Sequence, residues 1–351
     1  MAQVLPGGNN TFIPSHEASK RMIVDYVRNP KAFAYADYIQ IVKCPQRVGY
    51  YLKMNNDEAG RVLDDQGDEY LWNDGADAPS GRDGTAEHEW LPFITARRAF
   101  PFTLGQLAVD QASWRIDDVH RAYMAQKAMT VRTMNAVKVL TTPANHLSSH
   151  VLDVTDGTDI PGNTNTWATS TSARKTIQRS INEGIEKCLD DTLASLNFDD
   201  FVLIISDSLA KEIAVCQEIV EYLRQSPFAL AQIKGELRDS NPNAEYGLPE
   251  KLYSVRLVVE KTRRRTNKRR ATRVTTRVMP AATPVLAARP GTIEGSYGGP
   301  ALSAVTCFAY EEMTTETKRD KDNRRITGRV VEDYTHILTA PESCVLFQNA
   351  L

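Results

Sequence analysis

Cysteine is scarce in this sequence, and the arrangement of the few cysteines excludes two common kinds of site. The 351 residues contain five cysteines, an odd number, and no two of them form a CxxC pair. Zinc ribbons and redox-active thiols need that paired spacing, and a disulfide framework needs an even number. We therefore expect reduced, mostly buried thiols in a protein that works in a cytosolic setting. They are Cys44, Cys188, Cys216, Cys307 and Cys344.

Long apolar runs and an export signal are also lacking. No stretch approaches the roughly 20 apolar residues that a membrane-spanning helix requires. The sequence begins MAQVLPGGNNTF, without the basic region and apolar core of a secretory signal. Its composition, 42% hydrophobic and 25% charged, is typical of a globular protein. These features predict no membrane partner.

No catalytic signature is present, so we expect neither enzymatic activity nor a cofactor. The sequence has no phosphate-binding loop of the form GxxxxGK[ST] and no GxGxxG after a strand. Residues 295–298 resemble a nucleophile elbow, but Glu294 stands where that motif requires glycine. A flexible turn is therefore the favoured interpretation of residues 295–298.

Metal-ligating residues occur only in weak arrangements. His146 and His150 have a spacing that binds zinc on a helix, but no cysteine or acidic third ligand stands at a matching distance. Three aspartates within residues 153–159 suggest a calcium loop, without its alternating order or its bidentate glutamate. The acidic run at residues 64–69 is a further candidate for a cation site. Solvated acidic loops are favoured in both acidic stretches, and we predict no metal site.

The sequence does have charge of each sign gathered in a separate stretch. Residues 55–89 carry eleven acidic side chains against two arginines, which leaves a net charge of −9. Residues 261–277 carry nine basic side chains and no acidic one, whereas the whole chain sums to −2. Like charges this close repel each other within one globule, whereas complementary patches steer copies of a chain together and fix their register.

Three environments are open to the basic run. A predicted strand that begins at residue 257 runs into it, and residues 273–278 predict the return strand. The run has no aromatic residues among its cations for base stacking and matches no DNA-reading motif, so nucleic acid is the least favoured. A solvated hairpin and docking on a neighbouring copy are equally favoured. We predict an inter-subunit contact between acidic and basic side chains, and its residues are Asp57, Glu58, Asp64, Asp65, Asp68, Glu69, Arg263, Arg264, Arg265, Lys268, Arg269 and Arg270.

Two long elements predict an elongated body. Residues 116–140 contain neither Gly nor Pro and predict a helix of about 25 residues, about 40 Å long at 1.5 Å per residue. Residues 305–317 and 326–338, rich in Thr, Val, Tyr and Phe, predict the two legs of a hairpin of similar length. The polar residues 318–324 between them predict the turn.

A block with a core of its own is predicted between these long elements. Apolar stripes at residues 173–192 and 209–223 predict two helices, and residues 201–205 predict a buried strand between them. Residues 141–172 turn to Thr, Ser, Asn, Asp and Gly and predict a long surface connection. The block is typical of an α/β or α+β domain.

The N-terminal part of the chain is predicted to have little core. Residues 1–27 predict a flexible arm followed by a short helix, and residues 38–42 and 48–54 predict strands. Because residues 46–54 and 90–100 flank the acidic stretch, we expect them to form the two legs of an extended excursion with an acidic tip.

Four stretches also resemble phage and prophage capsid sequences. They are HRAYMAQKAMTVRTMNAV (120–137), FALAQIKGEL (228–237), YGLPEKLYSVRLVVE (246–260) and FAYEEMTTETKRDKDNRRITGRVVEDYTHILTAP (308–341). With the order of the predicted elements, they make the chain resemble the major capsid protein of tailed bacteriophages, which has the Hong Kong 97-like fold. The resemblance covers most of the chain and rests on architecture and position.

The resemblance implies an α+β fold in four parts, with a long spine helix and a long β-hairpin in the P-domain. The parts are the N-arm at 1–37, the E-loop excursion at 46–100, the P-domain at 101–149 and 303–339, and the A-domain at 150–302 and 340–351. The N-arm and the E-loop would each lie over a neighbouring subunit.

The same resemblance implies a structural function. The chain would self-assemble into hexamers and pentamers that form the icosahedral head shell around the phage dsDNA genome. It would assemble in the bacterial host cytoplasm and end in the virion. Its partners would be copies of itself, a separate scaffold protein, the portal, packaged dsDNA bound non-specifically and, where one is present, a decoration protein. Two alternatives are an encapsulin-like compartment for enzyme cargo and a basic nucleic-acid-binding protein.

Overall fold

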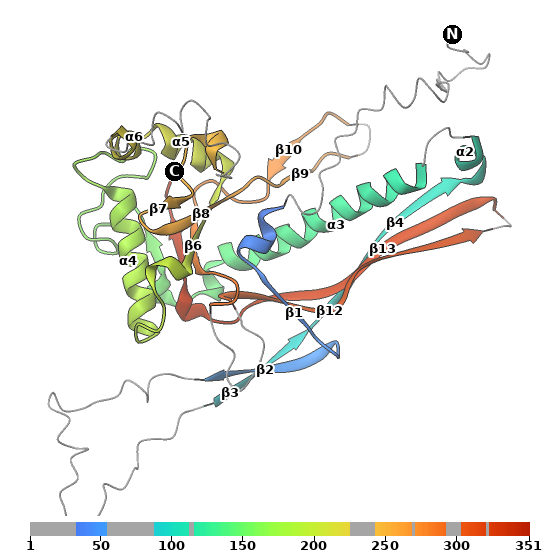
Figure 1. Cartoon of the computed structure of the whole chain (residues 1–351), viewed down its shortest axis with the longest axis horizontal. Helices are drawn as coiled ribbons and strands as arrows, with labels where there is room; N and C mark the ends of the chain where they lie inside the picture. The colour runs from blue at the N-terminus through green and yellow to red at the C-terminus, as the bar shows by residue number, and fades with distance from the viewer. Residues whose placement is uncertain are drawn as a thin grey trace, which may run out of the picture.

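The molecule has an elongated body built on two β-sheets (Figure 1). The computed structural model describes residues 33–54, 88–111, 116–224, 243–268, 271–292, 303–320 and 323–351. Several predictions fall outside these residues: the arm and helix at 1–27, most of the acidic stretch and the turn at 295–298.

A long sheet forms one half of the body, with its strands in the order β1-β12-β13-β4. The strands are β1 (Gln40–Lys43), β12 (Val305–Asp320), β13 (Arg325–Leu338) and β4 (Ala96–Gly105). The central pair confirms the predicted hairpin, in a register that runs from Val305 opposite Leu338 to Asp320 opposite Arg325. Strand β4 was not expected: residues 96–100, assigned to the excursion by sequence, pair with β13 instead.

A single long helix, α3 (Ile116–Thr141), covers one face of this sheet (Figure 1). Its bounds confirm the helix predicted over residues 116–140. Ala128 of the helix packs with Phe100 and Val330 of the sheet. The short helix α2 (Gln106–Gln111) connects β4 to this region.

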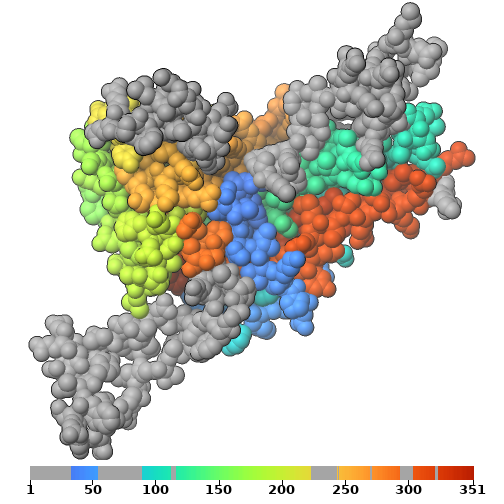
Figure 2. Space-filling model, in the orientation of Figure 1, coloured from blue at the N-terminus to red at the C-terminus, as the bar shows by residue number. Residues whose placement is uncertain are grey.

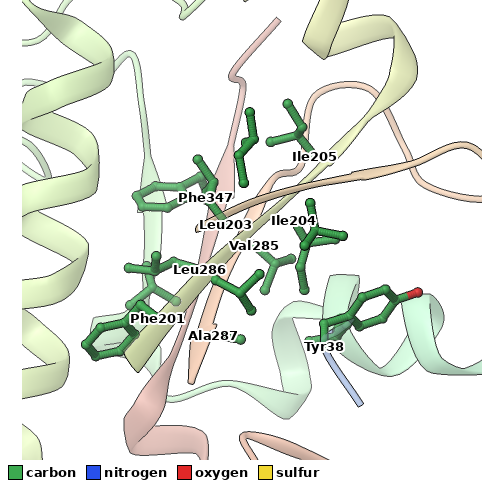
Figure 3. Packing of buried hydrophobic residues seen from close by; sticks show 14 of the residues in the cluster. Tyr38, Phe201, Leu203, Ile204, Ile205, Val285, Leu286, Ala287 and Phe347 are labelled. Carbon is green, nitrogen blue, oxygen red and sulfur yellow. The ribbon is translucent and has the colours of Figure 1, made fainter. Parts of the chain in front are cut away.

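The second sheet is the core of the compact half. Its strands, in spatial order, are β5 (Val151–Asp153), β14 (Cys344–Gln348), β11 (Val285–Ala288), β6 (Phe201–Ser206), β8 (Val255–Glu260) and β7 (Lys251–Leu252). Every residue of β6 is buried, as the apolar run predicts, because β11 and β8 flank it in the sheet and helices cover it. Figure 3 shows Leu203, Ile204 and Val285 packed within this core.

Three helices surround the second sheet. Helix α4 (Thr176–Asp191) confirms the first predicted stripe, with Ile177, Ile181 and Ile185 fully buried. The second stripe forms two helices rather than the single one expected, α5 (Asp207–Val215) and α6 (Gln217–Arg224). The chain is extended at Cys216 between them.

The break at Cys216 lets α6 stabilise the start of α4. The carboxylate of Glu218 accepts the backbone N–H groups of Ile177 at 3.1 Å and Gln178 at 3.0 Å. A buried carboxylate at the first turn satisfies amide donors that have no partner within their own helix. One continuous apolar stripe in the sequence therefore does not imply one continuous helix.

The prediction of a surface connection at residues 141–172 is wrong. Trp167 is fully buried, and its indole N–H donates to the Ser180 hydroxyl over 3.0 Å. Val154 and Ile160 are also buried. Isolated apolar residues in a polar stretch have no periodicity, so the sequence pattern does not reveal that they enter the core.

A buried polar cluster joins α3 and the segment before β1 to the long sheet. Arg132 of α3 lies 3.2 Å from Glu332 of β13 and stands 4.9 Å above the Tyr334 ring. Tyr35 and His336 share a hydrogen bond of 2.6 Å. Figure 2 shows residues 33–54, in blue, lying over the junction between the two halves of the body.

His336 is held neutral within this cluster. Burial, together with the nearby charges of Arg132 and Arg98, lowers the pKa of His336 to about 3. An unfolded histidine titrates near 6.5. The neutral ring therefore stabilises the folded chain above pH 6.5, and this stabilisation is lost as the pH falls from about 6.5 towards 3.

The basic run forms a two-stranded hairpin, β9 (Arg263–Arg265) and β10 (Thr275–Arg277). Arg263 and Arg277 are cross-strand partners, and both donate to the carboxylate of Asp207 at the start of α5. Burial alone raises the pKa of Asp207, but the hydrogen bonds and charges of the two arginines outweigh it and leave that pKa below its usual value. One buried carboxylate thus fixes both strands of the hairpin.

We expect His336→Gln to reduce the loss of stability in acid. Glutamine keeps an acceptor for the Tyr35 hydroxyl and does not titrate, so the free energy of unfolding should fall less between pH 7 and pH 4 than in the wild type. Urea titrations of the unassembled chain measure this. His120→Gln, at the half-exposed start of α3, is the control and should follow the wild type. Parallel pH curves for wild type and H336Q would contradict the assignment.

We expect Asp207→Asn to loosen the β9–β10 hairpin. Hydrogen bonds to charged groups contribute about 1.5–3 kcal/mol each, so amide exchange at Thr266 and Val278 should accelerate about tenfold or more. Mass spectrometry of exchanged peptides measures it. Asp199→Asn removes an exposed partner of Lys251 and should leave these amides unchanged. Equal exchange in D207N and wild type would show that the carboxylate does not hold the hairpin.

Candidate assembly interface

A two-stranded ribbon projects from the long sheet on the side away from α3. Strands β2 (Val48–Met54) and β3 (His88–Ile94) pair antiparallel, with Val48 opposite Ile94 and Met54 opposite His88. The strand predicted at residues 48–54 is confirmed. The acidic stretch connects the two strands at their far end.

One face of the ribbon is attached to the body by aromatic stacking. The Phe93 ring lies parallel to that of Phe308 of β12, with ring centroids 4.3 Å apart, and Tyr51 stacks on the same ring at 5.8 Å. Gly49 lies opposite Phe93, and a Cβ atom there would come within 2.5 Å of the Phe93 ring. Only glycine at that position allows the ring to lie over the ribbon backbone.

Ion pairs hold the same face. The Arg47 guanidinium lies 2.6 Å from the buried Asp333 carboxylate on β13, and Lys53 pairs with Glu342. Because Asp333 is buried, removing Arg47 would leave an uncompensated buried charge, which costs more than the loss of a surface ion pair. The ribbon is therefore held against its own chain at both ends, by Arg47 before β2 and by Lys53 near the end of β2.

The other face of the ribbon is apolar and exposed. Side chains alternate along a strand, so the residues between those that contact the body point away from it. Tyr50 and Trp90 are each 64% exposed. This face, which we call the ribbon's outer face, consists of three cross-strand pairs, Val48–Ile94, Tyr50–Pro92 and Leu52–Trp90.

A continuous apolar strip of this kind indicates an interface. Single exposed apolar residues are normal on a protein surface, but contiguous ones mark contacts with another molecule. Burying one large apolar side chain contributes about 1.5–3 kcal/mol. The outer face therefore offers a sizeable association energy that the isolated chain does not use.

The structure describes seven of the nine cations of the basic run and separates them into two groups. Arg263 and Arg277 are engaged by Asp207, and Lys261 pairs with Glu245. A second group is exposed and consists of Arg264, Arg265, Lys268 and Arg273. Arg269 and Arg270 lie outside the described residues, as do the acidic members of the predicted contact: Asp57, Glu58, Asp64, Asp65, Asp68 and Glu69. The predicted pairing of acidic and basic stretches stays a prediction.

The exposed cations of the hairpin continue onto α3. Arg264 donates to the sulfur of Met134 over 3.1 Å, which places the hairpin against the helix. Lys127 and Lys138 are exposed and share the helix face of Met134, seven residues before it and four after it. No acidic residue occurs between positions 119 and 141. We call Arg264, Arg265, Lys268, Lys127 and Lys138 the basic edge.

His146, His150 and Asp156, which were considered as metal ligands from sequence, have structural roles. His146 hydrogen-bonds the carbonyl of Leu140 at 2.7 Å, and His150 that of Cys344 at 3.1 Å. Asp156 accepts the N–H and hydroxyl of Thr158, so it closes a turn. In the described part of the chain, no group of three or more side chains could hold a metal ion. None of the described helices is long and apolar enough to cross a membrane.

Sequence reasoning missed the most informative residues of the interface. Asp207 was given no role in the sequence analysis, yet its carboxylate holds Arg263 and Arg277 of the basic run. Its position directly after β6, at a helix start, was the available signal. The alternation of Tyr50 and Leu52 was visible too, but it does not tell which face the chain itself covers.

Solved structures share the architecture of this chain, although comparisons by sequence find no match. No protein-family model matches the sequence, and no curated protein matches it. Among solved structures, a phage-related protein from Bordetella bronchiseptica aligns over 95% of this chain and 96% of its own, with 12% identity and a TM-score of 0.58. The capsid of Ralstonia phage GP4 aligns over 93% of each chain, with 9% identity and a TM-score of 0.57.

The capsid of bacteriophage PhiM1, in its mature form, is also similar. It aligns over 93% of this chain and 89% of its own, with 11% identity and a TM-score of 0.55. At such identities the likeness is one of fold. The mixed helix-and-sheet architecture, with its long helix, long hairpin and ribbon, is the Hong Kong 97-like fold of tailed-phage major capsid proteins.

Proposed function

We propose that this protein is the major capsid protein of a tailed phage, a structural subunit with no enzymatic role. Copies of it form hexamers and pentamers, which build the icosahedral head shell around the dsDNA genome. Shell assembly takes place in the bacterial cytoplasm with a scaffold protein and a portal, and the product is the virion head. The fold, shared with phage capsids over more than nine-tenths of the chain, supports this proposal.

The ribbon's outer face is the observation that carries the proposal. A two-stranded ribbon is at most marginally stable by itself, and the contacts of this one with the described part of the body are all on one face. Its outer face presents Trp90 and Tyr50 to solvent. A second copy that covers this face would bury both aromatics and offset the entropy of ordering the projection. An exposed apolar face of this kind is expected in a subunit that associates with other copies. A monomeric protein gains no stability from such a face.

We expect Trp90→Ser to prevent assembly and leave the subunit folded. The indole is mostly exposed in the single chain, so its removal should change the melting temperature of the unassembled chain by no more than about 1 °C. The interface would lose about 1.5–3 kcal/mol at every repeat of the contact, which should abolish shells in sedimentation velocity and negative-stain microscopy.

Trp90→Phe is the matched control, because phenylalanine keeps an aromatic ring on the outer face. W90F should assemble with a yield close to the wild type. Phe93→Ala, on the opposite face of the same strand, should instead lower the melting temperature of the single chain, since Phe93 packs on Phe308. A normal yield of shells from W90S would show that the outer face is not needed for assembly. A wild-type chain that sediments only as a monomer would sink the proposed function itself.

A further inference from the structure

The ribbon and the basic edge lie on opposite sides of the long sheet. Cys307 and Phe308 are neighbours on β12 and point to opposite faces of the sheet. Cys307 contacts Tyr35 in the buried cluster beside α3, whereas Phe308 stacks on Phe93 of the ribbon. Figure 1 shows the same order, with the β9–β10 hairpin along α3 and the β2–β3 ribbon beyond the sheet.

The basic edge is a prearranged surface. Asp207 holds both strands of the hairpin through Arg263 and Arg277, and the contact of Arg264 with Met134 places it along α3. The strands that carry the exposed cations are therefore placed against the helix. Such a surface loses little conformational freedom when it receives an anionic partner.

We propose that the basic edge binds the acidic segment, residues 55–87, of a second copy of this chain. The proposal rests on the proposed function, because it needs copies arranged head to tail. In a head-to-tail ring, a surface on one side of each subunit contacts a different surface on the other side of the next. The ribbon side of one copy then meets the α3 side of its neighbour.

Charge complementarity identifies the occupant. The segment begins after Met54 and ends before His88, at the end of the ribbon where these two residues pair. It carries ten acidic residues and two arginines, a net charge of −8. The hairpin and α3 present only cations along the basic edge. Long-range attraction between the two would steer subunits into contact, and the placement of the hairpin strands against α3 would set the register.

Two other anions could occupy the basic edge. The first is the acidic segment of the same chain, which would have to pass around the sheet and α3 to reach its own hairpin. The second is the phosphate backbone of nucleic acid, which also binds clustered cations. Neither alternative explains why the acidic segment and the basic edge lie on opposite sides of the long sheet. The acidic segment of a second copy is therefore the favoured occupant. Both alternatives are outcomes of the test.

Paired charge reversal provides the test. The hairpin variant is Arg264→Glu with Arg265→Glu, and the segment variant is Asp64→Lys with Asp65→Lys. Each is expected to lower shell yield at least about tenfold at low salt, because like charges would then meet at every subunit contact. The quadruple variant, with both reversals in one chain, should recover most of the yield.

Mixing the two variants distinguishes a contact between copies from one within a copy. The segment of the hairpin variant is still acidic and the hairpin of the segment variant is still basic, so alternating copies can pair. Partial recovery in the mixture supports the proposal. Recovery in the quadruple variant alone overturns it in favour of a contact within one chain. If neither recovers, and binding of the hairpin variant to a duplex DNA fragment has fallen, the partner is nucleic acid and the proposal is wrong.

Controls separate this inference from folding and from the proposed function. Lys318→Glu with Arg319→Glu makes the same change in charge on exposed residues at the tip of the β12–β13 hairpin, and it should assemble normally. Arg264→Gln with Arg265→Gln removes charge without reversing it and should give an intermediate yield. Normal shells from the hairpin variant overturn the inference alone. Absence of shells from the wild type overturns the proposed function.

Discussion

The parallel stack of Phe93 on Phe308 decides which surface this chain keeps for itself and which it presents. Side chains on a strand alternate, so attaching Phe93 and Tyr51 to the body turns Tyr50 and Trp90 outward. Among the described residues no helix covers the outer face of the ribbon, so the ribbon does not bury both of its faces. Association with another molecule is the remaining way to remove the second face from water, and the case for assembly depends on this constraint.

The body to which the ribbon is attached is held rigid at two places, the junction of α3 with the long sheet and the base of the β9–β10 hairpin. Arg132 and Glu332 form an ion pair inside the junction of α3 and the sheet, and Asp207 fixes the hairpin from the compact half. Buried charges are costly unless they are paired, so these contacts favour one arrangement of the elements over others. A stiff body carries projecting surfaces in defined directions, which a closed shell of identical copies requires.

The sequence predicts the long elements well because their signals are local. An uninterrupted run of helix formers predicts α3 nearly to the residue, and Thr- and Val-rich alternation predicts the β12–β13 hairpin. Strand β4 was missed because it continues directly from the ribbon with one residue, Thr95, between them. Trp167 was missed because a lone apolar residue has no period. The pairing of Asp207 with two arginines more than fifty residues away depends on tertiary structure alone.

Low sequence identity and a shared fold are consistent with the structural role proposed for this protein. The structural neighbours share 9–12% of their residues with this chain, yet the alignments cover almost all of it. The structural role proposed here requires no active site, and so no reaction fixes the identity and geometry of a few side chains. The fold needs apolar periodicity and element length, which many sequences supply. The surfaces where copies meet need only be complementary to each other, so they can change together. The contacts of one shell therefore have to be inferred from the charges and apolar faces of its own chain, as the ribbon and the basic edge allow here.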